Sequence, residues 1–292
     1  MKILFAGDDH PYSAYALKKV IELARNTLAD VTILVVAPTS ASKDVDIPLS
    51  PNHALIQALH RYRQEFIHEL GEAGSPYAQE RFSYEWKMVK FGLWEELKVC
   101  RGARKDLKIR LRAGHPANEI LAEAKKEGSD LIVLGCSKGS QCLWQDPADV
   151  PQAVVGNADC SVLLVKEDKP IKRILACIED STVSQESLEM INQMATIHKA
   201  QLELVGLTKD GAAKQVEYTR LIEVGDYYGD RGISVKNRLA EMKEFEAVIS
   251  KETDEDLLAF WMGKKSLLSV LFPKDWMDRF LSTCQSSVLV LR

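Results

Sequence analysis

The sequence predicts an α/β fold in which two similar domains follow one another along the chain. The first observation is a strand, a glycine-bearing loop, a helix and a second strand between Asp130 and Val165, the pattern of a βαβ unit with parallel strands. The second observation is that this pattern recurs between Asp256 and Leu291. Residues that match without a gap include Lys138 with Lys264, Ser140 with Ser266, Pro147 with Pro273 and Asp149 with Asp275. An internal repeat explains this better than chance.

Composition places the chain among globular proteins and narrows its partners. At 292 residues, it is long enough for two domains of ordinary size. Its 46% hydrophobic and 27% charged residues are typical of a soluble protein. The formal net charge of −4 offers no basic field for a phosphate backbone, so we expect no nucleic-acid partner. No apolar run approaches the length of a membrane span, so we expect no membrane partner either.

The first domain opens with a buried strand at 2–7, followed by the acidic turn of Asp8 and Asp9. A helix is predicted from Tyr12 to Asn26, because its apolar residues recur at spacings of three and four. A second strand follows from Val31 to Ala37. The second domain repeats this opening with Ile174 and Leu175, Glu179 and Asp180, and a strand from Leu202 to Leu207.

A helical insertion is predicted at about 39–105, where the first domain is longer than the second. One helix is expected after Pro51. Another is expected over the segment that contains Trp86 and Leu97, because its apolar residues also fit helical spacing. In the second domain the region shrinks to 209–232, which ends in a loose glycine-bearing turn.

Three histidines, His53, His60 and His68, raise the question of a metal site in the first of these helices. No acidic or cysteine partner stands at ligand spacing from them. The pattern is more typical of solvated or packed histidines on an amphipathic helix. We therefore predict no metal site.

The remaining elements complete the first domain. They are a strand at Leu107–Arg112 near the sheet edge, a helix with Pro116 at its first position, a strand at Leu131–Leu134, a helix at Ala148–Asn157 and a strand at Cys160–Val165. The domains are expected at 1–166 and 171–292, joined by a short charged linker. Their final strands are apolar on both faces although each would be a sheet edge. Because an exposed apolar edge invites aggregation, we expect Ser161–Val165 and Ser287–Leu291 to pair with each other.

Four motifs resemble those of universal stress protein domains. They are the acidic turn after the first strand, Gly114-His115-Pro116-Ala117 before a helix, the Asp130–Gly135 strand and the final Cys160–Val165 strand. The resemblance covers both copies. It implies a Rossmann-like, five-stranded parallel sheet in the order 3-2-1-4-5 in each domain, with pairing through the fifth strands. It also implies a cytoplasmic stress-response protein without a well-defined reaction, and a family in which some members bind ATP or AMP while others have lost the site.

Ligands of doubly wound sheets lie outside the carboxyl ends of the strands, here between the first and fourth strands. Nucleotide-binding members carry Gly, two residues, Gly, nine residues and then Gly-Ser or Gly-Thr, because glycines let backbone N–H groups approach phosphates. The resemblance places nucleotide contacts at Asp8, Gly135, Lys138, Ser140, Asp149 and Val150, and in the second copy at Glu179, Lys264 and Asp275.

Both copies depart from that pattern in the same way at the second glycine and at the serine, and the second copy also has Trp261 in place of the first glycine. Lys138 stands where the second glycine is expected, and Asp149 stands in place of the serine. Lys138 is read either as a phosphate-contacting cation or as a solvated loop lysine. Asp8 is read either as a contact for a base or ribose or as a cap of the first helix. We expect Lys138 to pair with Asp149, and Lys264 with Asp275, so that each copy closes its own anion site.

The resulting hypothesis is a tandem binding and regulatory protein of the stress response with a degenerate nucleotide site. No catalytic residue or obligatory cofactor is predicted, and ATP or AMP is the candidate ligand. The alternative is an ATP- or AMP-binding member with weak nucleotide hydrolase activity, which fold alone does not separate from the first hypothesis. Cys136 and Cys142 beside the loop could sense oxidants. An unidentified protein partner and assembly into a homo-oligomer are further hypotheses.

Overall fold

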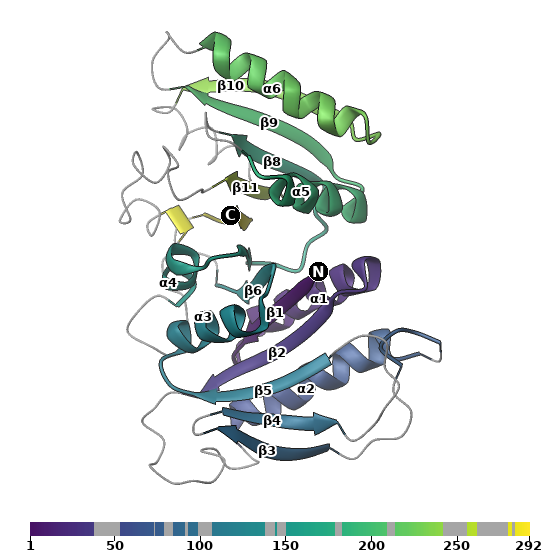
Figure 1. The fold of residues 1–292 in the computed structure, drawn as a ribbon, viewed down its shortest axis with the longest axis vertical. Coiled ribbons are helices and arrows are strands. Elements are labelled where there is room, and N and C mark those ends of the chain that lie inside the picture. The colour runs from purple at the N-terminus through teal and green to yellow at the C-terminus, as the bar shows by residue number, and fades with distance from the viewer. Residues whose placement is uncertain are drawn as a thin grey trace. The chain divides into compact units, whose positions relative to one another are not determined.

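The structure is a computed structural model (Figure 1). It describes residues 1–37, 53–72, 74–78, 84–90, 93–98, 107–137, 144, 150–178, 183–208, 214–241, 256–261, 280–281 and 284–292. The chain forms two compact units. Unit 1 contains Met1–Ser137 and Cys142–Asp168, and unit 2 contains Lys138–Gln141 and Lys169–Arg292.

Unit 1 contains a mostly parallel sheet covered by helices. Its elements are β1 (Lys2–Gly7), α1 (Pro11–Thr27), β2 (Asp30–Ala37), α2 (Ala54–Leu70), β3 (Tyr84–Lys90), β4 (Leu93–Lys98), β5 (Leu107–Ala113), α3 (Pro116–Glu127), β6 (Leu131–Gly135), α4 (Val150–Asn157) and β7 (Ser161–Val165). The order β5-β2-β1-β6-β7 is the predicted order 3-2-1-4-5, and these five strands are parallel.

Helices cover both faces of this sheet (Figure 1). The chain moves from β1 to β2 to β5 in one direction across the sheet, and from β5 back past β1 to β6 and β7 in the other. Because such crossovers are right-handed, α1 and α2 lie on one face while α3 and α4 lie on the opposite face. The helix α1 packs beside α2, and α3 packs beside α4.

The helix ends follow from local sequence. Pro11 and Pro116 stand at the first turns of α1 and α3, where a missing N–H costs nothing. Gly128 ends α3 in the left-handed region, with φ of 62°, and its N–H bonds to carbonyls of the last turn. The predicted helices at both places are confirmed.

The prediction of a second helix in the insertion is wrong. The segment around Trp86 forms β3, which pairs antiparallel with β4, and β4 pairs antiparallel with β5 through Trp94 and Leu111. Between Tyr84 and Met88, apolar residues alternate with charged ones, and this period of two fits a strand better than a helix. The hairpin therefore extends the sheet beyond β5, so β5 is not an edge strand.

Unit 2 repeats the parallel core. Its elements are β8 (Arg173–Ile178), α5 (Gln185–His198), β9 (Gln201–Thr208), α6 (Lys214–Gly229), β10 (Val235–Glu241), β11 (Leu257–Trp261) and β12 (Ser287–Leu291). The order β10-β9-β8-β11-β12 is again 3-2-1-4-5, and all neighbours are parallel. The prediction of a loose turn that begins at Gly225 is wrong, because α6 continues to Gly229 before the turn that ends at Gly232.

The position of α6 also corrects the predicted extent of the insertion. It connects the second and third strands of unit 2, as α2 precedes the third strand of unit 1. The helix α2 is therefore a shared element and not an insertion. The feature that unit 1 adds among the described residues is the hairpin of β3 and β4.

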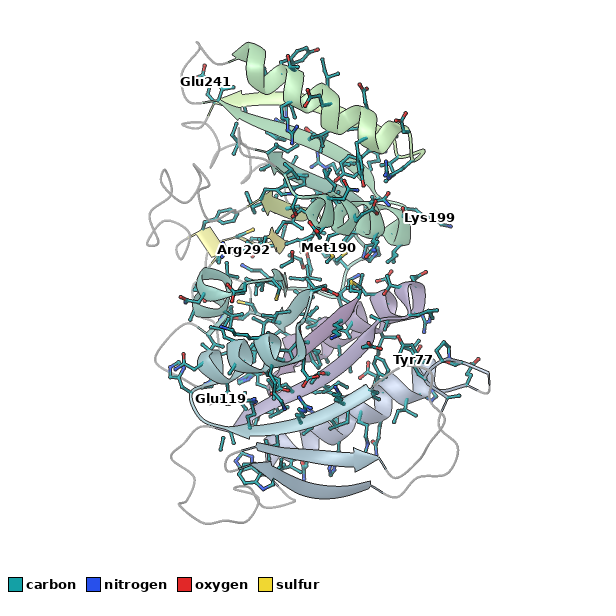
Figure 2. All side chains as sticks on the ribbon, in the orientation of Figure 1. Tyr77, Glu119, Met190, Lys199, Glu241 and Arg292 are labelled. Carbon is teal, nitrogen blue, oxygen red and sulfur yellow. The ribbon has the colours of Figure 1, made fainter. Side chains whose placement is uncertain are left out.

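A buried ionic cluster joins β5 to α3. Arg110 and Arg112 are buried, and both contact Glu123, whose side chain is fully buried. Arg112 also pairs with Glu119 of α3. Figure 2 labels Glu119 on this helix. Glu127 at the end of α3 receives hydrogen bonds from Arg110 at 2.5 Å and from Lys108 at 2.7 Å. The basic residues that alternate along β5 thus match a row of carboxylates on the covering helix.

No helix in the described part of the chain combines the length and the apolar character that a membrane crossing requires.

Candidate functional site

The candidate site lies where β1 and β6 end side by side. The two strands are parallel, with Ala6 opposite Leu134, so Asp8 and Gly135 come to the same edge of the sheet. Crossovers on the two sides of this strand pair run to opposite faces, which is the position where doubly wound sheets bind ligands. The predicted placement of Asp8 beside Gly135 is consistent with this topology.

The carboxylate of Asp8 is occupied by its own chain. Its Oδ1 accepts hydrogen bonds from the backbone N–H of His10 at 3.0 Å and from the hydroxyl of Ser13 at 2.8 Å. Its Oδ2 accepts from the hydroxyl of Tyr12 at 2.5 Å and contacts Nδ1 of His10 at 3.0 Å. A carboxylate offers about four acceptor positions, and all of them are used here. Asp8 is also buried, with 5% of its surface exposed.

Helix α2 closes over the turn that follows β1. The phenol of Tyr62 donates a hydrogen bond to the backbone carbonyl of Asp8, and its ring meets Phe5 edge to face at 5.3 Å. Burial, followed by the negative charge of Asp8, raises the pKa of Tyr62 to about 12. A Cβ at Gly7 would lie 2.9 Å from both rings, so this glycine permits the contact.

Gly135 has a structural role that is independent of phosphate. A Cβ at this position would lie 2.5 Å from the carbonyl oxygen of Tyr12, so only glycine lets β6 end against the start of α1. Its own carbonyl accepts a hydrogen bond from the indole N–H of Trp144 at 2.9 Å, and Trp144 is buried. A bulky ring therefore lies beside the first glycine of the loop.

Most of the other predicted site residues lie outside the described residues. They are Lys138, Ser140, Asp149, Glu179, Lys264 and Asp275, together with Cys142. The pairing of each lysine with its aspartate stays a prediction. Val150 is described as the first residue of α4, where its side chain is fully buried in unit 1.

The matching edge of unit 2 differs at one decisive position. Strand β11 ends in Trp261, whereas β6 ends in Gly135. Trp261 is 3% exposed, and its indole nitrogen is buried without a hydrogen-bond partner. A buried indole at the end of the fourth strand leaves less room for a ligand than a glycine does.

The sequence reasoning missed the side chains that surround Asp8. Tyr12 and Ser13 stand four and five residues after it, a spacing at which the first helical turn can face the preceding turn. This spacing is visible in the sequence and could have identified the two residues as partners of Asp8. Tyr62 and Trp144 carried no local signal, because their contacts join residues far apart in the chain or within a loop.

Unit 1 has two further features that resemble sites. A cavity of about 450 Å³ lies between α3 and α4, at the amino ends of β6 and β7 and thus opposite Asp8, with Leu121, Ala124 and Ile132 among its lining residues. Cys136 is buried and not in a disulfide. Within the described ranges, no three His, Cys, Asp or Glu residues gather as a metal site.

Comparisons with known proteins identify the fold. A model described as the universal stress protein family matches residues 1–166. No curated protein matches the chain.

Three solved structures illustrate the likeness. A universal stress protein from Archaeoglobus fulgidus has a TM-score of 0.64 at 14% identity, covering 99% of this chain and 98% of that one. A putative universal stress protein from Pseudomonas aeruginosa has a TM-score of 0.59 at 16% identity, with 99% and 92% covered. The cytoplasmic domain of a prokaryotic cation chloride cotransporter has a TM-score of 0.55 at 13% identity, with 99% and 94% covered. At these identities the likeness concerns the fold.

Proposed function

Because the chain belongs to the universal stress protein family, we propose that it is a regulatory protein of the stress response that acts by binding and whose nucleotide site is degenerate. The observation that carries this proposal is the state of Asp8. Its carboxylate meets four donor groups of its own turn and helix, so a base or ribose could bind it only by displacing one of them. A displaced buried donor would cost about 1–3 kcal/mol.

Unit 2 supports the proposal independently. Its fourth strand ends in a buried tryptophan where unit 1 has Gly135, so the two units would have lost nucleotide binding by different means. In unit 1 the carboxylate of Asp8 is bonded to its own turn and helix. In unit 2 the side chain of Trp261 occupies the position that corresponds to Gly135.

The loop of unit 1 adds an electrostatic argument that rests on sequence. If Asp149 replaces the serine that faces a phosphate, two negative charges about 4 Å apart repel by on the order of 4 kcal/mol at an effective dielectric near 20. Micromolar affinity corresponds to about −8 kcal/mol. Repulsion of this size would therefore move ATP toward millimolar binding.

The proposed cytoplasmic location rests on the family. The proposed pairing of the two final strands rests on their apolar edges. We place the protein in the cytoplasm and expect β7 and β12 to pair within one chain. A double variant with Val162→Cys and Val288→Cys tests this pairing. Rapid disulfide formation in the monomer would support it, whereas formation no faster than for Val162→Cys with Ser234→Cys would contradict it.

Nucleotide carried through purification separates the proposal from a nucleotide-binding or hydrolysing alternative. Protein purified without added nucleotide would be heat-denatured, and the supernatant analysed for ATP, ADP and AMP by chromatography. The proposal predicts far less than one nucleotide per chain. A stoichiometric amount would contradict it and favour the ATP- or AMP-binding alternative.

A repair experiment sharpens this test. The substitutions Tyr12→Phe, Ser13→Ala, Lys138→Gly and Asp149→Ser should together free two acceptor positions of Asp8 and remove the expected charge plug, so ATP binding should strengthen at least tenfold. The matched control is Lys264→Gly with Asp275→Ser in unit 2, which keeps Trp261 and should change nothing. Equal gains in both variants would contradict the account of the two units.

A further inference from the structure

We propose that His10 is a hydrogen-bond acceptor for ligands at the carboxyl edge of unit 1, with Nε2 as the accepting atom. The proposal goes beyond the function proposed above, because it concerns a group that the family resemblance did not single out and needs no nucleotide. It identifies the ligand as a small uncharged molecule that presents an O–H or N–H donor.

The chemistry of Asp8 fixes which nitrogen of His10 carries the proton. Nδ1 lies 3.0 Å from Oδ2 of Asp8, and an ionised carboxylate can only accept hydrogen bonds. Nδ1 must therefore be the N–H donor. In the neutral ring the other nitrogen, Nε2, then carries the lone pair. A carboxylate that holds an imidazole in one tautomer is the arrangement that makes the opposite nitrogen a defined acceptor.

One further contact fixes the direction of the His10 ring. It stacks on Tyr12 with ring centroids 5.3 Å apart and planes 7° apart, and Tyr12 is itself bonded to Asp8. The side chain of His10 remains 24% exposed, and no described residue donates to Nε2. Asp8 is saturated and Oδ1 of Asp9 is buried without a hydrogen-bond partner, so the partly exposed groups of this turn that can still accept are Nε2 of His10 and the carboxylate of Asp9.

Neighbouring charge selects the class of ligand. Asp8 lies in contact with the ring, and Asp9 lies 3.7 Å from Nδ1. Tyr12 and Tyr62 also pack against this turn, and Arg61 lies beside Tyr62. The pKa of Tyr62 is raised to about 12, so Tyr62 carries no charge at neutral pH. Two carboxylates near an acceptor disfavour an anion and favour a donor group. The site therefore suits an alcohol, phenol or amide rather than a phosphate.

The arrangement is specific to unit 1. In the matching turn of unit 2, Glu179 and Asp180 are followed by Ser181, so the sequence has no imidazole at this position. Together with Gly135 in unit 1 against Trp261 in unit 2, this difference makes unit 1 the ligand-binding half of the chain.

The tautomer is measured first, because it needs no ligand and no substitution. Long-range proton–nitrogen NMR spectra of the ¹⁵N-labelled protein, recorded on the neutral form of the ring, should show protonated Nδ1 and unprotonated Nε2 for His10. The variant Asp8→Asn, checked for folding by circular dichroism, should show a mixture of tautomers. A wild-type spectrum with the proton on Nε2 would overturn the proposal.

Ligand binding is tested with a matched pair of fragments, 4-fluorophenol and 4-fluoroanisole, followed by ¹⁹F NMR. The two differ in one donor, so the phenol should bind about two- to tenfold more tightly, which is the contribution of one hydrogen bond. His10→Phe keeps an aromatic ring and should abolish the difference, whereas His68→Phe on the exposed surface of α2 should preserve it. Equal binding of both fragments to the wild type, or no binding of either, would overturn the proposal. ATP affinity does not enter these readouts, so the proposed function stands or falls separately.

Discussion

Tyr62 on α2 donates a hydrogen bond, 2.5 Å long, to the backbone carbonyl of Asp8 after β1. The bond joins two segments that lie 54 residues apart. It fixes the turn that holds Asp8, and through it the side chains of His10 and Tyr12. The site at the carboxyl edge therefore depends on a helix that has no direct contact with the Asp8 carboxylate among the described hydrogen bonds.

Replacing Tyr62 by phenylalanine should test this dependence. The variant leaves a buried carbonyl without its donor, and we expect the free energy of unfolding at pH 7 to fall by about 1–3 kcal/mol in urea titrations. The pKa of Tyr62 is raised from 10 to about 12, so its stabilisation is complete below pH 10 and is lost as the pH rises toward 12. The wild type should lose more stability over that interval than Tyr62→Phe. Identical alkaline profiles would contradict the assignment.

The buried carboxylate of Glu123 should be essential for the stability of unit 1. Glu123→Gln removes the carboxylate that Arg110 and Arg112 share, while each arginine keeps a second carboxylate partner on α3. We therefore expect a loss of about 1.5–3 kcal/mol, the contribution of a hydrogen bond to a charged group. The matched control is Glu223→Gln, which breaks an exposed pair with Arg220 and should cost at most about 1 kcal/mol. Urea unfolding measures both. Similar losses of unfolding free energy in the two variants would show that the buried cluster stabilises the protein no more than an exposed ion pair does.

Glu127 should make unit 1 sensitive to acid. Burial opposes its charge, but hydrogen bonds from Lys108 and Arg110 outweigh burial and lower its pKa from 4.5 to about 2. Its stabilisation is therefore present above pH 4.5 and is lost as the pH falls toward 2. Glu127→Gln should destabilise the protein at pH 7 by about 1–2 kcal/mol, and the difference from wild type should shrink toward pH 2. Glu72→Gln, a change at an exposed surface, should follow the wild-type profile throughout.

Gly135 should be required for folding rather than for phosphate binding. Gly135→Ala places a Cβ 2.5 Å from the carbonyl oxygen of Tyr12, and we expect a loss of about 1–3 kcal/mol from the forced backbone shift. Gly156→Ala in α4 is the matched control, since its Cβ would meet nothing within 4 Å, and alanine should stabilise the helix by up to about 1 kcal/mol. Thermal unfolding would rank the three proteins. A Gly135→Ala protein as stable as wild type would contradict the packing argument.

The parallel strands could be predicted because they are buried on both faces and read as continuous apolar runs, as at Leu131–Gly135, whereas their order came from the resemblance to universal stress protein domains. The segment around Trp86 could not be assigned correctly by helical spacing alone, because its apolar residues fit two periods and pairing with β5 decides between them. The partners of Arg110 and Arg112 belong to a helix whose acidic residues look solvated in the sequence. Contacts across the fold, and not local pattern, place these charges.

The candidate site could likewise be predicted only in part from the sequence. Asp8 and Gly135 were placed at one edge by topology, which follows from the order of the elements. The occupation of Asp8 by Tyr12 and Ser13, and the burial of Trp144 beside Gly135, depend on side-chain directions that a motif does not encode. A match to the first glycine of a phosphate loop is therefore compatible with a glycine that serves only packing.

The central claim is that Asp8 is already satisfied by its own chain and leaves no nucleotide site of ordinary affinity. Isothermal titration calorimetry of the full-length protein with ATP and Mg²⁺ at pH 7 tests this claim most directly. The account predicts no saturable heat at micromolar ATP, and binding only toward millimolar concentrations. A micromolar dissociation constant that is lost in Asp8→Ala would contradict it, because Asp8 would then be available to the nucleotide.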